Sequence, residues 1–302
     1  MDLGTLRRAL EGERYVFDDS LLTTLYISIK LGKPLLIEGA AGVGKTEVAK
    51  VIAAAYGTEL IRLQCYGGLD EAKALYEWNY QKQLLSIQLD MKHGDSGPGG
   101  ENPGDKKLEG LFSREFLLER PLLKAILSDF STVLLIDEID KADEEFEAFL
   151  LELLSDFQVS IPELGTIRAT ASPVIVLTSN NTRQLSDALR RRCAYLFIEY
   201  PSMEKEIAIL KAKIPGVPEK LASDIAAAVA YLRSNEGIFK KPSIAETLDW
   251  ASALLTLDAK RLDEAGAEKT MGFLLKNQED ILQFKENGGF GRFFAEQSGQ
   301  VL

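Results

Sequence analysis

The stretch GAAGVGKT at residues 39–46 has the residue types and the spacing that hold a nucleotide phosphate. Glycines at positions 39, 42 and 44 let backbone N–H groups turn toward the anion, where a Cβ atom would obstruct its approach. Lys45 supplies a mobile positive charge to the outer phosphates, and Thr46 offers a hydroxyl group to Mg²⁺. We therefore expect ATP to bind along Gly39, Ala40, Ala41, Gly42, Val43, Gly44, Lys45, Thr46 and Glu47.

A pair of carboxylates follows a second apolar run, TVLLIDEID. Asp137 is suited to hold Mg²⁺ through its water shell, and Glu138 to polarise the water that attacks the terminal phosphate. Adjacent residues at a strand end point in different directions, so the two carboxylates can serve both roles without colliding. An enzyme that phosphorylates a small molecule would not need Glu138, because its substrate supplies the nucleophile. The pair therefore favours ATP hydrolysis.

Two further groups come later in the chain. Asn180 ends the run VIVLTSN and is suited to orient the attacking water or to touch the γ-phosphate; the alternative is an asparagine that only forms a turn. The stretch LRRRC then places three arginines directly before the last apolar run. An arginine offered to a neighbouring subunit's γ-phosphate would raise the rate by about 10³–10⁵. Such a role requires subunits arranged in a ring.

These groups must be positioned by an α/β domain. Near-continuous apolar runs, separated by helical patterns, are typical of a parallel sheet covered on both faces. The predicted strands are 34–38, 60–65, 132–136, 174–178 and 195–199. From Met203 to about Asn287 the pattern is wholly helical, with Ser202 and Ser243 as candidate N-caps. The sequence thus predicts a phosphate-loop α/β domain at 1–201, a small all-helical lid domain at 202–288 and a C-terminal tail at 289–302.

Three other segments carry specific expectations. An apolar stripe at helical spacing is predicted to be core; it consists of Phe146, Phe149, Leu150, Leu153, Leu154 and Phe157. The stretch 90–110 is rich in glycine, proline and charges and is predicted to be a mobile loop, which would place His93 in solvent. The phenylalanines of the tail look exposed, and the sequence leaves open whether the tail is a docking peptide or a loosely packed end.

Composition excludes some classes of function. The chain has 302 residues and a formal charge of −11, which argues against nucleic-acid binding because phosphate contacts need clustered Lys and Arg. A single histidine excludes a His-cluster metal site. Cys65 and Cys193 are predicted to be reduced, buried or half-buried thiols. The first residues lack the apolar core of a secretory signal, and no apolar run is long enough to span a membrane. A cytoplasmic protein is expected.

Taken in order, GAAGVGKT, LLIDEID, TSN and LRRRC, with a helical domain after them, resemble an AAA+ ATPase. The stretch 157–173 reads as a β-hairpin at about 158–170, like the pre-sensor-1 hairpin of one AAA+ branch. The stretches LQCYGGLDEAKALYEWNYQKQLL and LFSREFLLERPLLKAI resemble the helix-2 insert of MoxR-type ATPases, here about 66–112. Within MoxR proteins, the chain resembles the CoxD-like subgroup, which is associated with carbon monoxide dehydrogenase maturation.

The resemblance implies roles by position. Lys45 and Thr46 match the Walker A pair, with Thr46 a ligand of Mg²⁺; Asp137, a second Mg²⁺ ligand, and Glu138 match Walker B. Asn180 matches sensor 1, and Arg192 matches the arginine finger, with Arg191 as the alternative. One departure concerns the lid, where many MoxR relatives place a sensor-2 arginine. Here Ala245 stands nearest that position, so lid sensing falls to Lys240 or Lys241 or is absent.

The resemblance also implies a function. MoxR proteins act as hexameric rings with partners that carry a von Willebrand factor A domain, and they mature metalloenzymes. By that resemblance this chain is expected to be a remodelling chaperone that hydrolyses ATP with Mg²⁺ and acts on a molybdenum- or copper-containing dehydrogenase. Two alternatives stay open: a nucleic-acid motor, since similar hairpins grip DNA in helicases, and a nucleotide-dependent scaffold without turnover.

Overall fold

The structure, a computed structural model, describes residues 2–92, 110–128 and 132–298. The chain forms two compact units, each built from separated segments. The first unit comprises Met1–Thr23, Glu38–Val51 and Phe197–Leu302, and the second comprises Thr24–Ile37 and Ile52–Leu196. Within the described ranges, none of the helices combines the length and the apolar character needed to cross a bilayer.

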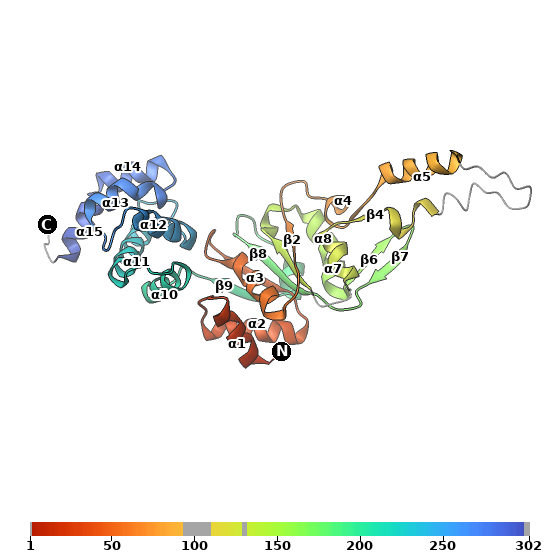
Figure 1. Ribbon diagram of the computed structural model, residues 1–302, viewed down its shortest axis with the longest axis horizontal. Helices are drawn as coiled ribbons and strands as arrows, with labels where there is room; N and C mark the ends of the chain where they lie inside the picture. Colours follow the sequence, from red (N-terminus) through yellow and green to blue (C-terminus); the bar gives the residue numbers. More distant parts are fainter. Residues whose placement is uncertain (1, 93–109, 129–131, 299–302) are drawn as a thin grey trace, which may run out of the picture. The chain divides into compact units, whose positions relative to one another are not determined.

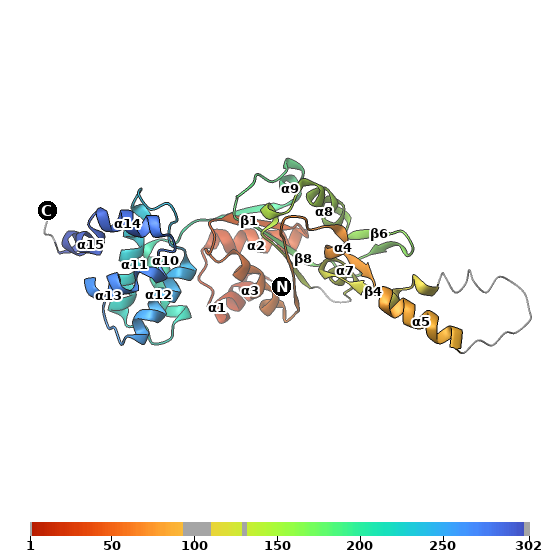
Figure 2. The ribbon, with the colours of Figure 1, turned by 90° about the horizontal axis from the view of Figure 1, so that it is seen from above.

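A five-stranded sheet carries the phosphate loop and the acidic pair (Figures 1 and 2). Its strands are β1 (Leu35–Gly39), β2 (Leu60–Gln64), β5 (Val133–Asp137), β8 (Val174–Ser179) and β9 (Ala194–Ile198). They lie in the order β2-β5-β8-β1-β9, and β5 runs parallel to both β2 and β8. Every predicted strand is present, with each end within one residue of its prediction. The predicted parallel α/β fold class is therefore confirmed.

The core of the second unit packs against this sheet and includes α7 (Pro121–Leu127) and α8 (Glu144–Asp156). Helix α8 begins after Asp143, whose carboxylate accepts a hydrogen bond from the Phe146 amide at 2.9 Å. The predicted apolar stripe faces this core: four of its members are buried and two are partly buried. The prediction that the stripe is core rather than a site is confirmed.

Two small antiparallel pairs belong to the second unit. β3 (Tyr76–Trp78) pairs with β4 (Leu117–Glu119), and β6 (Gln158–Ile161) pairs with β7 (Gly165–Arg168). The second pair lies within the range where the sequence predicts a hairpin, and Figures 1 and 2 show it as a ribbon beside α7 and α8. The described part of the second unit also contains the helices α4 (Glu71–Ala74), α5 (Tyr80–Lys92), η1 (Arg114–Phe116), η2 (Ile139–Lys141) and α9 (Asp187–Arg192).

The loop predicted at 90–110 is wrong at its beginning, because α5 continues to Lys92. Residues 90–92 have the sequence Asp-Met-Lys, which is compatible with a helix that is already formed upstream. Extending an existing helix adds one hydrogen bond for each residue that is fixed, so the helix runs past the point where the polar composition begins. His93 and the rest of this stretch to 109 lie outside the described residues.

Among the described residues, eight helices lie wholly in the first unit. They are α1 (Leu3–Gly12), α10 (Met203–Lys213), α11 (Glu219–Ser234), α12 (Ile244–Thr256), α13 (Glu264–Thr270), η3 (Met271–Phe273), α14 (Gln278–Glu286) and α15 (Gly289–Gln297). Helices α2 (Asp19–Leu31) and α3 (Lys45–Tyr56) run from this unit into the second. Ser202 and Ser243 stand at the N-caps of α10 and α12, as predicted. The independence of 202–288 as a domain remains a prediction.

The phenylalanines of the tail are not exposed, and that interpretation of the sequence was wrong. Phe290 and Phe293 of α15 are buried in a core cluster that contains Trp250 and Phe284. The rings of Phe290 and Trp250 stack with centroids 6.0 Å apart, and Phe290 meets Phe284 edge-on at 5.1 Å. The glycines between the phenylalanines suggested a loose end, but the apolar spacing fits one face of a short helix.

A buried ion pair joins α10 to α11 and also contacts α12, the helix that Ser243 caps. Glu206 is 1% exposed and accepts a forked pair of hydrogen bonds from Arg233, at 2.6 and 2.9 Å. The Thr247 hydroxyl donates to the same carboxylate at 2.8 Å, and Arg233 also donates to the Pro242 carbonyl at 2.8 Å. Residues of α10, α11 and α12 thus share one polar centre.

We expect Arg233→Met to lower the free energy of unfolding by about 3–5 kcal/mol, because removing one partner leaves the Glu206 carboxylate buried and uncompensated. Chemical denaturation would measure the loss. The matched control is Lys211→Met, which breaks a solvent-exposed pair with Glu219 in the same group of helices and should change stability little. Equal losses in the two variants would contradict the prediction.

Candidate functional site

The phosphate loop joins β1 to α3 in the first unit. Gly42 and Gly44 have φ angles of +74° and +95°, a region that side chains rarely adopt. Lys45 opens α3 and is 6% exposed; its Nζ donates to the carbonyl oxygens of Gly39 at 2.8 Å and Ala40 at 2.6 Å. The lysine therefore lies back across its own loop, where the helix N-terminus also favours an anion.

Glu47, in the first turn of α3, is held by two lysines. Lys213 of α10 lies 3.1 Å from one of its oxygens, and Lys50 lies 3.2 Å from the other. Burial alone would raise the pKa of the Glu47 carboxyl, but these two cations outweigh it, and the pKa is lowered. The contact joins the helix of the phosphate loop to α10 within the first unit.

The N-terminus of α12 meets the phosphate loop. A Cβ atom added to Gly42 would lie 2.3 Å from the Ser243 hydroxyl oxygen and 3.7 Å from the Ala245 Cβ. Ser243 caps α12, and its amide donates to the Glu246 carboxylate at 2.8 Å. Ala245 thus stands beside the loop, where the resemblance suggested a sensor-2 arginine. The Lys241 ammonium donates to the Asn235 carbonyl.

The close contact between Gly42 and Ser243 can be tested by replacing the glycine with alanine. We expect Gly42→Ala to destabilise the protein by about 2–5 kcal/mol, since the methyl group meets Ser243 and the backbone angle is unfavourable for alanine. Gly44→Ala is the matched control: its backbone angle is also positive, but nothing lies within 4 Å of the added atom. Denaturation midpoints of the two variants separate the clash from the strain. If Gly44→Ala costs as much as Gly42→Ala, the contact with Ser243 is unimportant.

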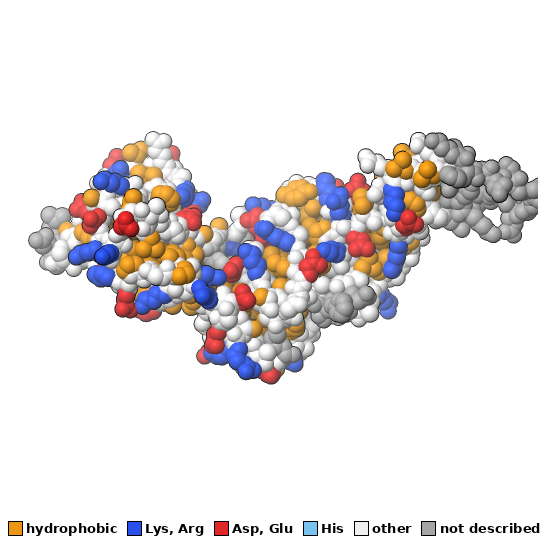
Figure 3. Space-filling model, in the orientation of Figure 1, with side chains coloured by type: hydrophobic (Ala, Val, Ile, Leu, Met, Phe, Trp, Pro, Cys, Tyr) orange, Lys and Arg blue, Asp and Glu red, His pale blue; other side chains and the backbone are white. Residues whose placement is uncertain are grey.

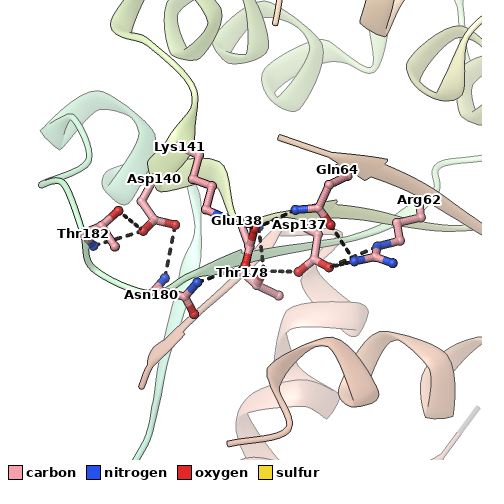
Figure 4. A network of polar contacts seen from close by, with 9 residues as sticks. All are labelled: Arg62, Gln64, Asp137, Glu138, Asp140, Lys141, Thr178, Asn180 and Thr182. Atoms are coloured by element: carbon pink, nitrogen blue, oxygen red, sulfur yellow. Dashed lines mark hydrogen bonds and ion pairs between the residues drawn. The ribbon is translucent and has the colours of Figure 1, made fainter. Parts of the chain in front are cut away.

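In the second unit, Asp137 ends β5 with its side chain 4% exposed. Its Oδ1 accepts a hydrogen bond from the Thr178 hydroxyl at 2.5 Å. Its Oδ2 accepts two from Arg62 of β2, at 3.1 Å from Nε and 2.6 Å from Nη2 (Figure 4). Strand β2 pairs in register with β5, with Gln64 opposite Asp137. A buried carboxylate at this strand end is therefore matched by a cation from the neighbouring strand.

Glu138 is the next residue, yet different groups hold it. Its backbone is left-handed, with φ +57°, which turns its side chain away from that of Asp137. Its carboxylate accepts hydrogen bonds from Gln64 at 2.8 Å and Asn180 at 3.2 Å, and Lys141 lies 2.6 Å away (Figure 4). The Glu138 amide donates to the Thr178 hydroxyl at 2.9 Å. The predicted divergence of the two carboxylates is present.

Asp140 joins the turn after β5 to the turn after β8. Its carboxylate accepts from the Asn180 amide at 3.1 Å, the Thr182 amide at 3.0 Å and the Thr182 hydroxyl at 2.6 Å. Burial alone would raise the pKa of Asp140, but these hydrogen bonds outweigh it, and the pKa is lowered. The position of Asn180 is thus fixed by an ionised side chain, which the sequence analysis did not identify.

The negative charges of this cluster shift the pKa values of neighbouring side chains. The hydrogen bond and the charge of Glu138 raise the pKa of Lys141. Burial, together with the charges of Asp137, Asp140 and Glu138, raises the pKa of the Cys65 thiol to about 12. Cys65 is buried and Cys193 is half-buried, both as free thiols, in agreement with the sequence. Burial also raises the pKa of the Cys193 thiol to about 12, so neither thiol is available as a nucleophile near neutral pH.

The arginines of α9 point to different environments. Ser186 caps the helix, and Arg190 lies over the Tyr195 ring at 5.9 Å. Arg192 is exposed; its Nε donates to the Ser155 hydroxyl at the end of α8 at 2.6 Å. Arg191 is also exposed. Both Arg191 and Arg192 are therefore accessible to another molecule, and the hydrogen bond to Ser155 fixes the position of the Arg192 side chain.

The residues of the second unit fit Mg²⁺. Magnesium in nucleotide sites takes one or two carboxylates and completes its shell with phosphates and water, so a cluster of several acidic ligands is not needed. The described residues contain no group of three or more His, Cys, Asp or Glu side chains arranged for a metal. Asp137 is a buried carboxylate at a strand end and has the chemistry of such a single ligand; Arg62 is its partner cation in this structure.

The structure thus brings together three of the predicted residues, Asp137, Glu138 and Asn180, in one hydrogen-bonded network. In the other unit it brings Lys45 against Gly39 and Ala40. Six residues of the network were missed by the sequence analysis: Arg62, Gln64, Asp140, Lys141, Thr178 and Thr182. A signal existed for two of them, because Arg62 and Gln64 alternate with buried apolar residues in the strand LIRLQ and share one of its faces.

Comparison with known proteins identifies the family to which the chain belongs. Residues 34–193, more than half of the chain, match the family described as AAA domain (dynein-related subfamily). Among curated proteins, none matches the sequence. Among solved structures, the RuvB Holliday junction branch migration motor of Thermotoga maritima is 18% identical, with a TM-score of 0.50 over 88% of this chain and 72% of that one.

A point variant of the same Thermotoga maritima RuvB gives the same TM-score of 0.50, identity of 18% and coverage of 88% and 72%. At this identity the likeness shows a shared fold. The phosphate loop, the acidic pair at the end of β5 and Asn180 directly after β8 all fall within the range matched by the family. The chain is therefore a member of the AAA domain family, in its dynein-related subfamily.

Proposed function

We propose that this protein is a ring-forming AAA+ enzyme that hydrolyses ATP with Mg²⁺ and uses the energy to remodel another protein. The observation that carries the proposal is the separate support of two adjacent carboxylates. Asp137 is held by Thr178 and Arg62, and Glu138 by Gln64, Asn180 and Lys141. Such an arrangement suits one acid that binds the metal and one that activates water.

The proposed roles follow from the chemistry of each group. Lys45 and the backbone of 39–46 bind the β- and γ-phosphates, and the hydroxyl of Thr46 and the carboxylate of Asp137 hold Mg²⁺. When bound, Mg²⁺ neutralises charge that develops on the phosphate oxygens. Glu138 accepts a proton from the attacking water, and Asn180 orients that water or the γ-phosphate.

We further propose that Arg192 completes the site of a neighbouring subunit, with Arg191 as the alternative. Both side chains are exposed at the C-terminal end of α9, the short helix directly before β9. The Ser155 contact would hold Arg192 until a neighbour's nucleotide offers a stronger partner, since an exposed neutral hydrogen bond is weaker than a pair with phosphate. A hexamer is the ring size that the resemblance to MoxR proteins suggests.

The proposed target is a metalloenzyme, reached together with a partner that carries a von Willebrand factor A domain. This assignment rests on the resemblance of the stretches at 66–112 to the helix-2 insert of MoxR proteins. A capture experiment tests it: tagged Glu138→Gln protein, loaded with ATP, should retain partner and target together, whereas Lys45→Ala protein should retain neither. Retention by both variants would indicate nucleotide-independent binding and count against remodelling.

A nucleic-acid motor is the alternative, favoured by the likeness to a branch migration motor. The hairpin of β6 and β7 gives it little support, because its arginine, Arg168, donates to Gln158 at 3.0 Å and a glutamate, Glu163, lies in the connecting turn. Among the described residues on the face seen in Figure 3, acidic and basic side chains are interspersed. Stimulation of ATP turnover by added DNA would favour this alternative.

A further inference from the structure

Arg62 occupies the carboxylate that the proposed function assigns to Mg²⁺. Its two N–H groups both point at Oδ2 of Asp137, at 3.1 and 2.6 Å, and fill positions where that oxygen accepts hydrogen bonds. Oδ1 is engaged by the Thr178 hydroxyl at 2.5 Å. A metal ion, or a water of its shell, that bound Oδ2 would therefore compete directly with Arg62.

The same guanidinium reaches the second acid through Gln64. Arg62 Nη2 donates to the Gln64 side-chain oxygen at 2.5 Å, and the Gln64 amide donates to Glu138 at 2.8 Å (Figure 4). The bond from Arg62 fixes which way the Gln64 amide faces, because its oxygen must accept and its nitrogen is then directed to Glu138. One arginine thus determines the surroundings of both carboxylates.

Arg62 is able to leave this position. It lies on β2, which is the edge strand of the sheet, and its side chain is 52% exposed, whereas that of Asp137 is 4% exposed. Rotation of Arg62 into solvent would displace no core residue. Asp137, in contrast, cannot follow it, and its buried charge requires a replacement cation. A divalent ion supplies that charge.

We propose that Arg62 is a positioning residue that holds Asp137, and through Gln64 also Glu138, in the nucleotide-free protein, and that Mg²⁺ replaces it at Asp137 when Mg·nucleotide binds. This inference rests on the proposed function, because it takes Asp137 as a magnesium ligand.

The direct test measures how Mg²⁺ supports nucleotide binding. Wild-type and Arg62→Met proteins, stripped with EDTA, are mixed with fluorescent mant-ADP and titrated with Mg²⁺. We expect the Mg²⁺ concentration at half-saturation to be about 3–10-fold lower in Arg62→Met, because the competing cation is gone. An unchanged or higher value would overturn the inference, since Arg62 would then be neutral or would support the metal.

The matched control is Arg120→Met. Arg120 is a second half-exposed arginine of the same unit, paired with Glu77 at 2.6 Å and 43% exposed, and it has no contact with the acids in the described structure. Its removal should leave the Mg²⁺ titration unchanged. A shift in both variants would mean that general loss of positive charge, not displacement at Asp137, causes the effect, and would also overturn the inference.

A second measurement needs no nucleotide. In EDTA, a double-mutant cycle combines Arg62→Met with Asp137→Asn and follows thermal unfolding. We expect Arg62→Met to lower the melting temperature when Asp137 is intact but not in the Asp137→Asn background, where no buried charge needs the arginine. Equal effects in both backgrounds would overturn the pairing. Failure of wild-type protein to bind mant-ADP at any Mg²⁺ concentration would instead refute the proposed function, and the cycle would still decide whether Arg62 holds Asp137.

Discussion

Replacing Glu138 by glutamine should reduce ATP turnover by about 10²–10⁴-fold while leaving ATP binding nearly unchanged. Glutamine has the shape of glutamate, so the backbone and the contact with Asn180 survive. It cannot accept a proton from water at neutral pH, so the chemical step loses its base. Phosphate release under saturating ATP measures the loss, and mant-ATP fluorescence measures the binding.

The control for this change is Glu152→Gln, on the exposed face of α8 and away from the acidic network. It removes the same charge and should keep full turnover. If wild-type and Glu138→Gln proteins hydrolyse ATP equally slowly, Glu138 is not the base and the chain is better described as a nucleotide-dependent scaffold. A loss of ATP binding in Glu138→Gln would show that the residue supports the site rather than the reaction.

Replacing Arg192 by alanine should reduce turnover by about 10³–10⁵-fold, because an arginine that stabilises charge on the transferring phosphate contributes that much in related chemistry. The effect should act between subunits. Specific activity of the wild type should therefore rise with protein concentration as rings assemble, and the Arg192→Ala activity should stay low at every concentration. The same measurement on Arg191→Ala decides which arginine acts.

Mixing two inactive variants gives the sharpest version of this experiment. In a ring, a site made of Glu138 from an Arg192→Ala subunit and Arg192 from a Glu138→Gln neighbour is intact. An equal mixture should recover about one quarter of the wild-type sites if subunits assort at random. If size-exclusion chromatography shows that rings form in the mixture and no activity returns, a shared site is refuted. The control Ser155→Ala should remain active, since Ser155 only holds Arg192 in the resting protein.

The sequence predicted the strands and the apolar stripe of α8 because both patterns depend on local burial. Near-continuous apolar runs form buried strands, and every one of the five was placed within a residue. The ends of α5 and α15 were harder. At 90–92 the composition suggested a loop, whereas the helix continues; at 289–297 it suggested a tail with exposed phenylalanines, whereas Phe290 and Phe293 are buried.

For the site, the sequence identified residues that have a spacing of their own, such as Asp137, Glu138 and Asn180. It missed Arg62 and Thr178, whose roles depend on which strands lie beside β5. The order β2-β5-β8 puts Arg62 on one side of Asp137 and Thr178 on the other. No short motif encodes that order, since residues 62, 137 and 178 are far apart in the chain and meet only through sheet pairing.

Asp140 has a mechanical consequence. By clamping residues 180–182 it makes the carboxyl end of β8 part of the same rigid piece as the turn after β5. The opposite end of β8 is joined, through five residues, to the hairpin of β6 and β7. Strand β8 is hydrogen-bonded to a neighbouring strand on each side and is therefore stiff along its length. β8 thus forms a stiff connection between the residues next to the acidic pair and the segment that leads to the hairpin.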